Sequence, residues 1–205
     1  MSEPASPQPV NHHADHPGFA GIGGTLCGLV FLLVGRANAR LAVSLARPAA
    51  GDHVVDVGCG PGTAARTAAR CGARVTGVDP AATMLRMARA VTRRQDVTWA
   101  EGSAEALPVA DGTATVVWAL ATVHHWRDAS AGVAEAHRVL RAGGRLLAIE
   151  RRTTRDATGL ASHGWTREQA ESFAELCRTT GFVDVDVRGE RAGRRDVWAV
   201  TGHRA

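Results

Sequence analysis

Residues 54–63 combine one acid and three glycines in a segment that could bind a cofactor. The string V-V-D-V-G-C-G-P-G-T reads as an apolar strand that turns sharply into a helix. Glycine allows a tight turn and a close approach of backbone to ligand, and amides at a helix start attract anionic groups. The acid and the spaced glycines are Asp56, Gly58, Gly60 and Gly62. A dinucleotide fingerprint requires a further glycine where Thr63 stands. A plain strand-turn-helix is the alternative interpretation.

A second acid follows at the interval expected for a ribose ligand. Residues 74–79 read as a buried strand, R-V-T-G-V-D, which ends in Asp79. Parallel strands direct their carboxyl ends toward the ligand crevice, and an acid about 20 residues beyond the glycines commonly binds ribose hydroxyls. We therefore predict that Asp79 binds ribose. Its alternative role is to cap the helix that follows Pro80.

Three histidines are the candidates for chemistry at the acceptor side of the crevice. His124 and His125 follow the strand predicted over residues 114–120, and His163 precedes a later helix. Trp165, beside His163, is expected to offer a surface on which the acceptor stacks. An unperturbed imidazole ionises near neutral pH and can act as a general base. We predict a catalytic or acceptor-binding role for at least one of them, with structural packing as the alternative. No zinc-type Cys or His spacing and no metal-ligand carboxylate set is visible, so no metal is expected.

The elements that must position these residues alternate between strands and helices. The expected strands are 54–57, 74–79, 97–101, 114–120, 145–150, 183–187 and 196–201. The expected helices are 80–94 and 128–141, the second with Asp128 as its N-cap. A further helix starts at the capping box Thr166-x-x-Gln169 and ends at Gly181. This order predicts an α/β fold: a Rossmann-like, doubly wound, seven-stranded sheet, mostly parallel with one antiparallel strand.

This layout, over residues ~48–203, resembles the type 11 branch of the class I S-adenosylmethionine (SAM) methyltransferases, which includes quinone-biosynthesis enzymes. The match lies in the strings VVDVGCGPGT, VTGVDPAATMLRMA, EGSAEALPVADGT, ALATVHHW and EAHRVLRAGGRLLAIE. The resemblance implies that SAM is the cofactor. It assigns the methionine half of SAM to Asp56, Gly58, Gly60 and Gly62, and the ribose to Asp79. Pro80 and Ala81 would lie near the adenosine, Ser103 and Ala104 would contact adenine, and the Ala119 carbonyl would accept from the SAM ammonium group.

Two positions depart from the family pattern. The family usually has an acid where Ser103 stands, and a hydroxyl accepts from the adenine amino group without charge assistance. It also usually has Asp at the start of the fourth strand, where this chain has Thr115. We interpret the second departure as structural.

Composition limits the partners. The 205 residues suffice for one domain, and the 24 basic residues are all arginine, with a net charge of +4 and no basic run. Nucleic-acid binding requires clustered cations, so it is not expected. The four cysteines lack a C-x-x-C pair and indicate neither zinc binding nor a disulfide scaffold. Cys59, inside the glycine loop, is expected to pack.

The N-terminus divides into two expected parts. Residues 1–16, rich in Pro, Ser and His, predict a flexible tail in which His12, His13 and His16 are a weak metal-binding candidate. Residues 17–47 predict a helical cap, with a helix from about 24 to 46 covering the cofactor cleft. The uncharged stretch 17–35 leaves two alternatives to the cap, a weak peripheral membrane contact and a membrane span. Residues 48–205 form the SAM-binding domain. We expect a cytoplasmic protein; the oligomeric state is left open.

These observations favour a SAM-dependent methyltransferase that acts on a small-molecule acceptor by in-line O-, C- or N-methylation. The alternatives are a SAM-binding protein that transfers no methyl group, such as a cyclase or a regulatory pseudoenzyme, and an NAD(P)-dependent oxidoreductase. The missing fingerprint glycine at Thr63 argues against the last.

Overall fold

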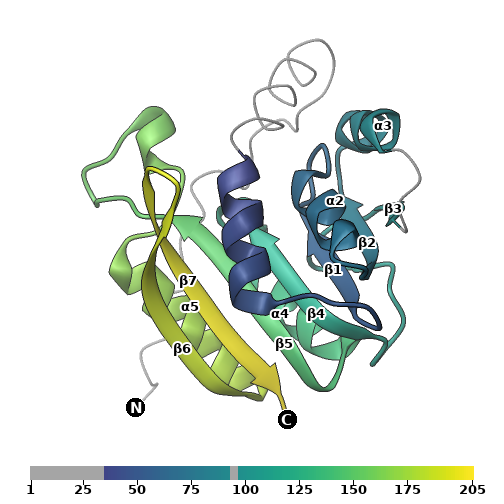
Figure 1. Ribbon diagram of the computed structural model, residues 1–205. Coiled ribbons are helices and arrows are strands. Elements are labelled where there is room, and N and C mark those ends of the chain that lie inside the picture. The colour runs from purple at the N-terminus through teal and green to yellow at the C-terminus, as the bar shows by residue number, and fades with distance from the viewer. Residues whose placement is uncertain (1–34, 93–96) are drawn as a thin grey trace.

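One seven-stranded sheet organises the chain. The computed structural model describes residues 35–92 and 97–205 (Figure 1). The strand order is β3-β2-β1-β4-β5-β7-β6. The strands are β1 His53–Val57, β2 Arg74–Asp79, β3 Val97–Glu101, β4 Ala114–Leu120, β5 Leu140–Arg151, β6 Phe182–Ala192 and β7 Arg195–Arg204. β7 runs antiparallel to both of its neighbours, and the other pairings are parallel. The predicted fold class is confirmed.

Helices cover both faces of this sheet. The helix over residues 35–46 and α2 (Thr63–Arg70) pack on one face, and α4 (Ala129–Val139) and α5 (Arg167–Thr180) pack on the other (Figure 1). α3 (Ala82–Val91) contacts β2 and β3. Two short 3-10 helices, η1 (Val123–His125) and η2 (Gly159–Ser162), follow β4 and β5.

The two-sided cover explains why β1 and β4 are almost entirely buried and largely apolar. All five residues of β1 are buried. Val55 and Val57 face the α4 and α5 side, whereas Val54 faces α2 and the helix over residues 35–46. Strands that are covered on both faces require continuous apolar runs rather than alternation. This arrangement fixes β1 and β4 firmly, so the loops at their carboxyl ends start from rigid supports.

The helix caps that the sequence predicts are present in the structure. The Asp128 carboxylate accepts from the amides of Ser130 and Ala131 at the start of α4. Thr166 and Gln169 form the reciprocal capping box of α5, which ends at Gly181 with φ 105°. These signals act over three or four residues, so the sequence alone was enough to predict them.

Some boundaries differ from the prediction. β5 begins at Leu140 rather than at residue 145, because Leu140 pairs with Ala114 of β4 beyond a register shift. α3 is shorter than the predicted 80–94 helix. β6 and β7 extend into a long hairpin that includes most of the segment between the predicted strands 183–187 and 196–201. The differences in β5, β6 and β7 depend on pairing with a distant segment, which local sequence does not encode.

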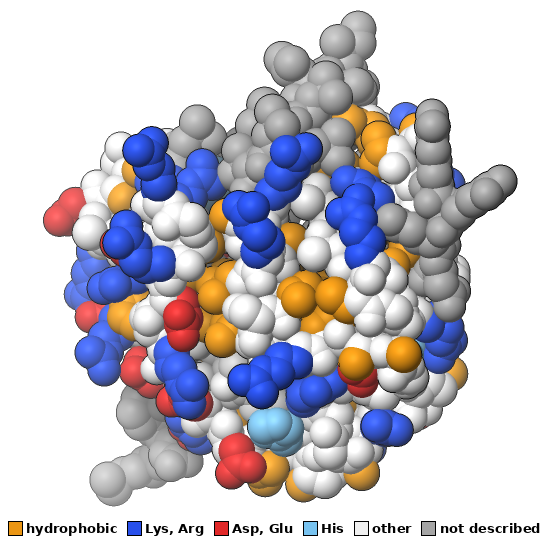
Figure 2. Space-filling model, viewed as in Figure 1, with side chains coloured by type: hydrophobic (Ala, Val, Ile, Leu, Met, Phe, Trp, Pro, Cys, Tyr) orange, Lys and Arg blue, Asp and Glu red, His pale blue; other side chains and the backbone are white. Residues whose placement is uncertain are grey.

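The N-terminal predictions are only partly covered by the described residues. The predicted tail 1–16, the cap as far as residue 34 and almost all of the candidate membrane contact lie outside them. Residues 35–46 are helical, and Ala42 and Ala46 are buried against the sheet. Within residues 35–92 and 97–205, no helix is long and apolar enough to cross a membrane. Figure 2 shows arginine side chains spread over the visible face rather than gathered in one patch.

Candidate active site

The glycine loop is held in place by β2. It leaves β1 at Gly58 and enters α2 at Thr63. The Cys59 amide donates to the Val78 carbonyl at 3.0 Å, and the Gly60 amide donates to Asp79 Oδ2 at 2.8 Å. Burial, together with the charges of the nearby carboxylates, raises the pKa of the Cys59 thiol well above its usual range. Cys59 is therefore a packing residue rather than a nucleophile.

Two glycines of the loop are required for different reasons. Gly58 and Gly60 have φ values of +66° and +52°, in the left-handed region. A Cβ on Gly58 would overlap the side chain of Thr122, in the segment after β4. A Cβ on Gly60 would meet no heavy atom of the described residues within 4 Å. Gly58 thus lets two loops of the protein touch, whereas Gly60 faces open space where a cofactor could lie.

Asp56 is a buried acid beneath this loop. It is 2% exposed, and its Oδ2 makes no hydrogen bond of ordinary geometry within the described part of the chain. Burial raises the pKa of Asp56 to about 7, although nearby Trp118 and Ala65 N–H groups oppose the shift; the charge of Asp79 adds to it. A buried carboxyl oxygen without a partner is costly, so this position suits a cationic ligand group.

Asp79 ties the loop to the start of α3. Its Oδ1 accepts from the Ala81 amide at 2.8 Å, while Oδ2 holds Gly60. Burial raises the pKa of Asp79, partly offset by these two hydrogen bonds. The N-cap of α3 is Ala81, so Asp79 supports the turn ahead of the helix rather than capping the helix itself. Pro80 is exposed beside it.

The segment predicted to contact adenine follows β3. Ser103 is half-buried and bridges to Ala106, and Ala104 is buried. Glu105 accepts from the amides of Arg127 and Asp128 and so connects this segment to the chain just beyond the histidines. The adenine contacts of Ser103 and Ala104 remain predictions.

The segment after β4 touches the glycine loop. β4 ends at Leu120, one residue beyond Ala119, and Ala121 adopts φ 55°. Thr122 then packs against Gly58 and directly precedes η1, which carries His124 and His125. The predicted cofactor loop and the predicted acceptor-side histidines therefore share one edge of the sheet. The carbonyl role of Ala119 remains a prediction.

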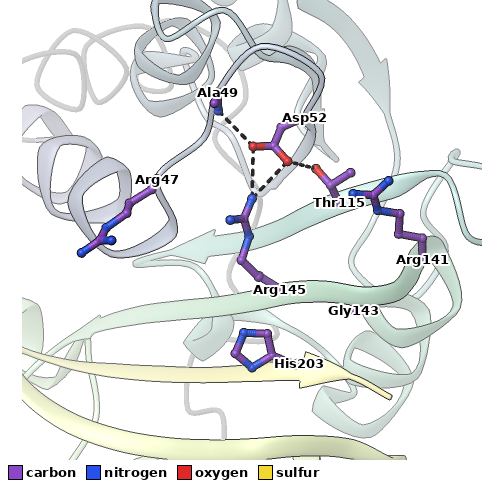
Figure 3. A pocket seen from close by; sticks show the side chains of 8 residues that line it. All are labelled: Arg47, Ala49, Asp52, Thr115, Arg141, Gly143, Arg145 and His203. Carbon is purple, nitrogen blue, oxygen red and sulfur yellow. Dashed lines mark hydrogen bonds and ion pairs between the residues drawn. The ribbon is translucent and has the colours of Figure 1, made fainter.

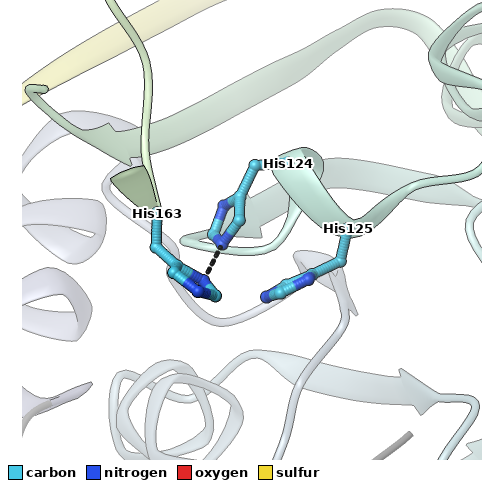
Figure 4. A group of neighbouring side chains, drawn as sticks. All are labelled: His124, His125 and His163. Atoms are coloured by element: carbon cyan, nitrogen blue, oxygen red, sulfur yellow. Dashed lines mark hydrogen bonds between the residues drawn. The ribbon is translucent and has the colours of Figure 1, made fainter. Parts of the chain in front are cut away.

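The three candidate histidines form one group, the histidine cluster of His124, His125 and His163. Each offers a ring nitrogen that lies within 4.8 Å of the other two. Nε2 of His124 and Nδ1 of His163 are 3.3 Å apart, and the ring centroids are separated by 4.0 to 5.5 Å. Figure 4 shows the rings turned toward one another.

Glu150 orients His124 and was not among the predicted site residues. Its side chain is fully buried near the end of β5; Oε2 contacts His124 Nδ1 at 2.9 Å, and Oε1 accepts from the Val123 amide at 2.7 Å. Burial lowers the pKa of His124, but the charge and hydrogen bond of Glu150 outweigh this effect and raise it. An acid near the end of a buried strand, as at Asp79, was the available signal.

His163 reaches the cluster because the chain returns to the end of β5. The Trp165 amide donates to the Arg151 carbonyl at 2.8 Å, and the Thr153 amide donates to Trp165 at 2.9 Å. Trp165 is 1% exposed and packs on Phe173, so the predicted stacking of an acceptor on this ring is not supported.

A cavity at the opposite edge of the sheet has a structural explanation. It encloses about 340 Å³ and is lined by Arg47, Ala49, Asp52, Thr115, Arg141, Gly143, Arg145 and His203 (Figure 3). Thr115 donates to Asp52 at 2.6 Å, and Arg145 contacts both oxygens of that carboxylate. Burial alone would raise the pKa of Asp52, but hydrogen bonds from Thr115 and Ala49 and the charge of Arg145 lower it. Thr115 is thus a structural residue.

Comparison with known proteins decides the family. Residues 55–148 match the Methyltransf_11 family model, described as a methyltransferase domain. Residues 55–148 therefore form a methyltransferase domain of the type 11 family, within the class I SAM-dependent methyltransferases. The match begins in β1 and ends in β5, so it contains the glycine loop, Asp79 and the η1 histidines.

Relatives of this methyltransferase-family chain act in quinone biosynthesis. It is 38% identical over 111 residues to the ubiquinone/menaquinone biosynthesis C-methyltransferase UbiE of Rubrivivax gelatinosus, covering 54% of this chain and 44% of the relative. It is 31% identical over 159 residues to a ubiquinone biosynthesis O-methyltransferase of a Methylobacterium species, covering 69% and 64%. The chain spans less than half the length of the first of these relatives.

Solved structures share the fold. A SAM-dependent methyltransferase from Aquifex aeolicus aligns with a TM-score of 0.68 at 16% identity, over 82% of this chain and 90% of that one. Phosphoethanolamine N-methyltransferase 2 of Haemonchus contortus, in a complex with S-adenosylhomocysteine, aligns with a TM-score of 0.70 at 18% identity, over 89% and 58%.

The residues present fit the cofactor of the family. The space beside Gly60 accommodates a ligand close to backbone amides, and Oδ2 of Asp56 lacks a partner in the described region. Each Asp79 oxygen accepts one hydrogen bond and retains capacity for a hydroxyl. The glycine loop, Asp56 and Asp79 would hold SAM, which supplies an activated methyl group.

Proposed function

We propose that this chain transfers a methyl group from SAM to a small-molecule acceptor bound against the histidine cluster. The observation that carries the proposal is the contact between Gly58 and Thr122. It joins the cofactor loop to the segment that bears His124 and His125. A methyl donor and an acceptor-binding group on these two segments would be neighbours, as in-line transfer requires.

Each part of the edge has a distinct task in this proposal. The loop and Asp79 bind and orient the cofactor, and Ser103 and Ala104 line its adenine end. The histidine cluster binds the acceptor and promotes loss of its proton, with Glu150 fixing the orientation of His124. During transfer the S–CH3 bond breaks, a bond from the methyl carbon to the acceptor forms, and sulfur keeps the electron pair.

The atom that receives the methyl group is not inherited from the relatives. The name of one relative specifies C-methylation and the name of the other specifies O-methylation. We therefore propose a small hydroxyl- or acidic-carbon-bearing acceptor, because such groups need help in losing a proton and a histidine cluster can give it.

The test uses the purified chain with methyl-labelled SAM and a panel of phenols, enols, amines and thiols. We expect S-adenosylhomocysteine to form only with acceptors that have an ionisable hydroxyl or carbon. His125→Gln and His163→Gln should lower turnover by about 10²–10⁴ while S-adenosylhomocysteine affinity stays close to wild type. His203→Gln, at the opposite edge, is the matched control. Tight cofactor binding without transfer to any acceptor would favour a non-transferring SAM-binding protein.

A further inference from the structure

We propose that the histidine cluster, supported by Glu150, is a binding site for one divalent transition-metal ion of the zinc type. Imidazole nitrogens suit zinc and its neighbours, whereas magnesium prefers oxygen ligands. Within the described part of the chain, the three histidines of the cluster bring their ring nitrogens close enough to share one ion. Two of them come from η1 and one from the segment after β5.

The spacing of the nitrogens fits one ion. Zinc–nitrogen bonds of about 2.0–2.1 Å in a tetrahedral shell place ligand nitrogens roughly 3.3–3.4 Å apart. His124 Nε2 and His163 Nδ1 are 3.3 Å apart. The nitrogen of His125 lies within 4.8 Å of both, so a modest rotation of its half-buried ring would complete a three-nitrogen set.

Glu150 provides the support that metal-binding histidines usually have. Ligand histidines commonly donate their second ring N–H to a carboxylate, which fixes the tautomer and aims the other nitrogen at the metal. Glu150 Oε2 holds Nδ1 of His124 at 2.9 Å, so Nε2 points toward His163. Glu150 is itself fixed by the Val123 amide, which makes the orientation rigid.

Sequence spacing gave no sign of this site, because its ligands come from separate elements. His163 is 39 residues from His124, and Glu150 is 26 residues from it. The pairing of β4 with β5 places Glu150 beside His124, and the return of the chain to the end of β5 then adds His163. A hydrogen-bonded chain from Glu150 through His124 to His163, without a metal, is the competing arrangement that the experiment must separate.

A cation here would narrow the acceptor class, and this step rests on the proposed function. Three nitrogen ligands leave a tetrahedral ion one further position, which an acceptor hydroxyl can take. A bound cation lowers the pKa of an oxygen ligand, so the favoured acceptor is a phenol or enol rather than an amine. The hydroxyl proton passes to water, the S–CH3 bond of SAM breaks, and an O–CH3 bond forms.

The experiment measures zinc and cobalt(II) binding to the full-length chain, purified without a histidine tag and stripped with a chelator. His12, His13 and His16 are first replaced by alanine, because they could bind metal independently. Zinc affinity comes from competition with a chromophoric chelator. X-ray absorption reports whether the metal ligands are nitrogen or sulfur, which separates the cluster from the cysteines.

We expect one zinc per chain, with nitrogen ligands. Glu150→Gln should weaken zinc binding by about 10–100-fold, and His125→Gln and His163→Gln should weaken it further. His203→Gln should leave it unchanged. Thermal unfolding of each variant shows that it is folded, and the half-buried His125 and His163 keep the test valid if Glu150→Gln fails to fold.

Three results would overturn the inference: no zinc binding in the alanine background, retained binding after His163→Gln, or sulfur ligands. S-adenosylhomocysteine binding and methyl transfer are measured on the same samples. Methyl transfer by a chain that binds no zinc would contradict the metal site and leave the proposed function intact. Zinc binding without cofactor binding would support the metal site and contradict the proposed function.

Discussion

The carboxylate of Asp79 accepts a hydrogen bond of 2.8 Å from the backbone amide of Gly60, nineteen residues earlier in the chain. Its other oxygen holds the Ala81 amide at the same distance. The residue predicted to bind ribose therefore also shapes the loop that binds the rest of the cofactor. Its ligand role and its structural role coexist, because a carboxylate has acceptor capacity for both.

Asp79→Ala should consequently affect stability and affinity together. Two amide donors lose a charged acceptor, so the unfolding free energy of the cofactor-free protein should fall by about 1.5–3 kcal/mol. Affinity for S-adenosylhomocysteine should fall roughly ten- to hundredfold. Urea unfolding and calorimetry measure the two effects. Asp79→Asn keeps one acceptor oxygen and should lose less stability. If folded Asp79→Ala binds S-adenosylhomocysteine as tightly as wild type, then Asp79 only supports the glycine loop and does not bind the cofactor.

Gly60→Ala and Gly58→Ala form a matched pair that separates ligand contact from protein packing. Both place alanine at positive φ, which costs roughly 1–2 kcal/mol. Gly60→Ala adds no clash within the described protein, so its main effect should be weaker S-adenosylhomocysteine binding. Gly58→Ala also meets Thr122 and should lose more stability, part of which Thr122→Gly should restore. Thermal unfolding with and without ligand measures both. Wild-type affinity in Gly60→Ala would show that the cofactor lies elsewhere.

Sequence predicted the fold well where the signal is local or continuous. β4 matches its predicted range because a buried parallel strand is an unbroken apolar run. The helix caps at Asp128 and Thr166 were also predicted, because each acts on amides only two or three residues away. The start of β5 was missed, because the pairing of Leu140 with Ala114 depends on the sheet and not on neighbouring residues.

The same distinction holds for the site, where residues with a local sequence pattern were predicted and contacts between distant segments were not. The glycine loop and Asp79 lie within 24 residues of one another, and each has its own pattern. The histidines were predicted as separate candidates at the crevice, but the sequence did not show that they meet or that Glu150 contacts His124. The contact of His163 with His124 requires the segment after β5 to return and pair beside the end of β5. Likewise, Trp165 was expected at the acceptor, whereas its large apolar ring is more stable in the core against Phe173.

Asp56 should make stability depend on pH in an identifiable range. Its pKa of about 7 lies above the unfolded value of about 3.9, so between these values the folded state holds a proton that the unfolded state has released. The contribution of Asp56 therefore favours folding at low pH and is lost as the pH rises toward 7. The full difference corresponds to roughly 4 kcal/mol at most.

The measurement compares wild type with Asp56→Asn by urea unfolding between about pH 4 and pH 8. The stability of wild type relative to the variant should decline up to about pH 7 and then level off, because Asn does not titrate. Subtracting the variant cancels other carboxyl groups such as Asp52, whose lowered pKa acts in the opposite direction. A constant difference across the range would mean that Asp56 is ionised throughout.

Thr115 offers a test of why this chain departs from the family residue. Its hydroxyl donates to Asp52 at 2.6 Å and accepts from the His53 amide at 3.0 Å. Thr115→Val leaves both groups without that partner and should cost about 1–3 kcal/mol of unfolding free energy.

Thr115→Asp restores the usual family residue but places a second carboxyl group against Asp52. Because adjacent carboxylates resist joint ionisation, this variant should be less stable than Thr115→Val at neutral pH and should recover as the pH falls. Denaturant unfolding at two pH values measures the effect, and S-adenosylhomocysteine affinity should be unchanged in both variants, since Thr115 lies at the amino end of β4. If Thr115→Asp is as stable as wild type at neutral pH, the hydrogen bond to Asp52 does not explain the departure.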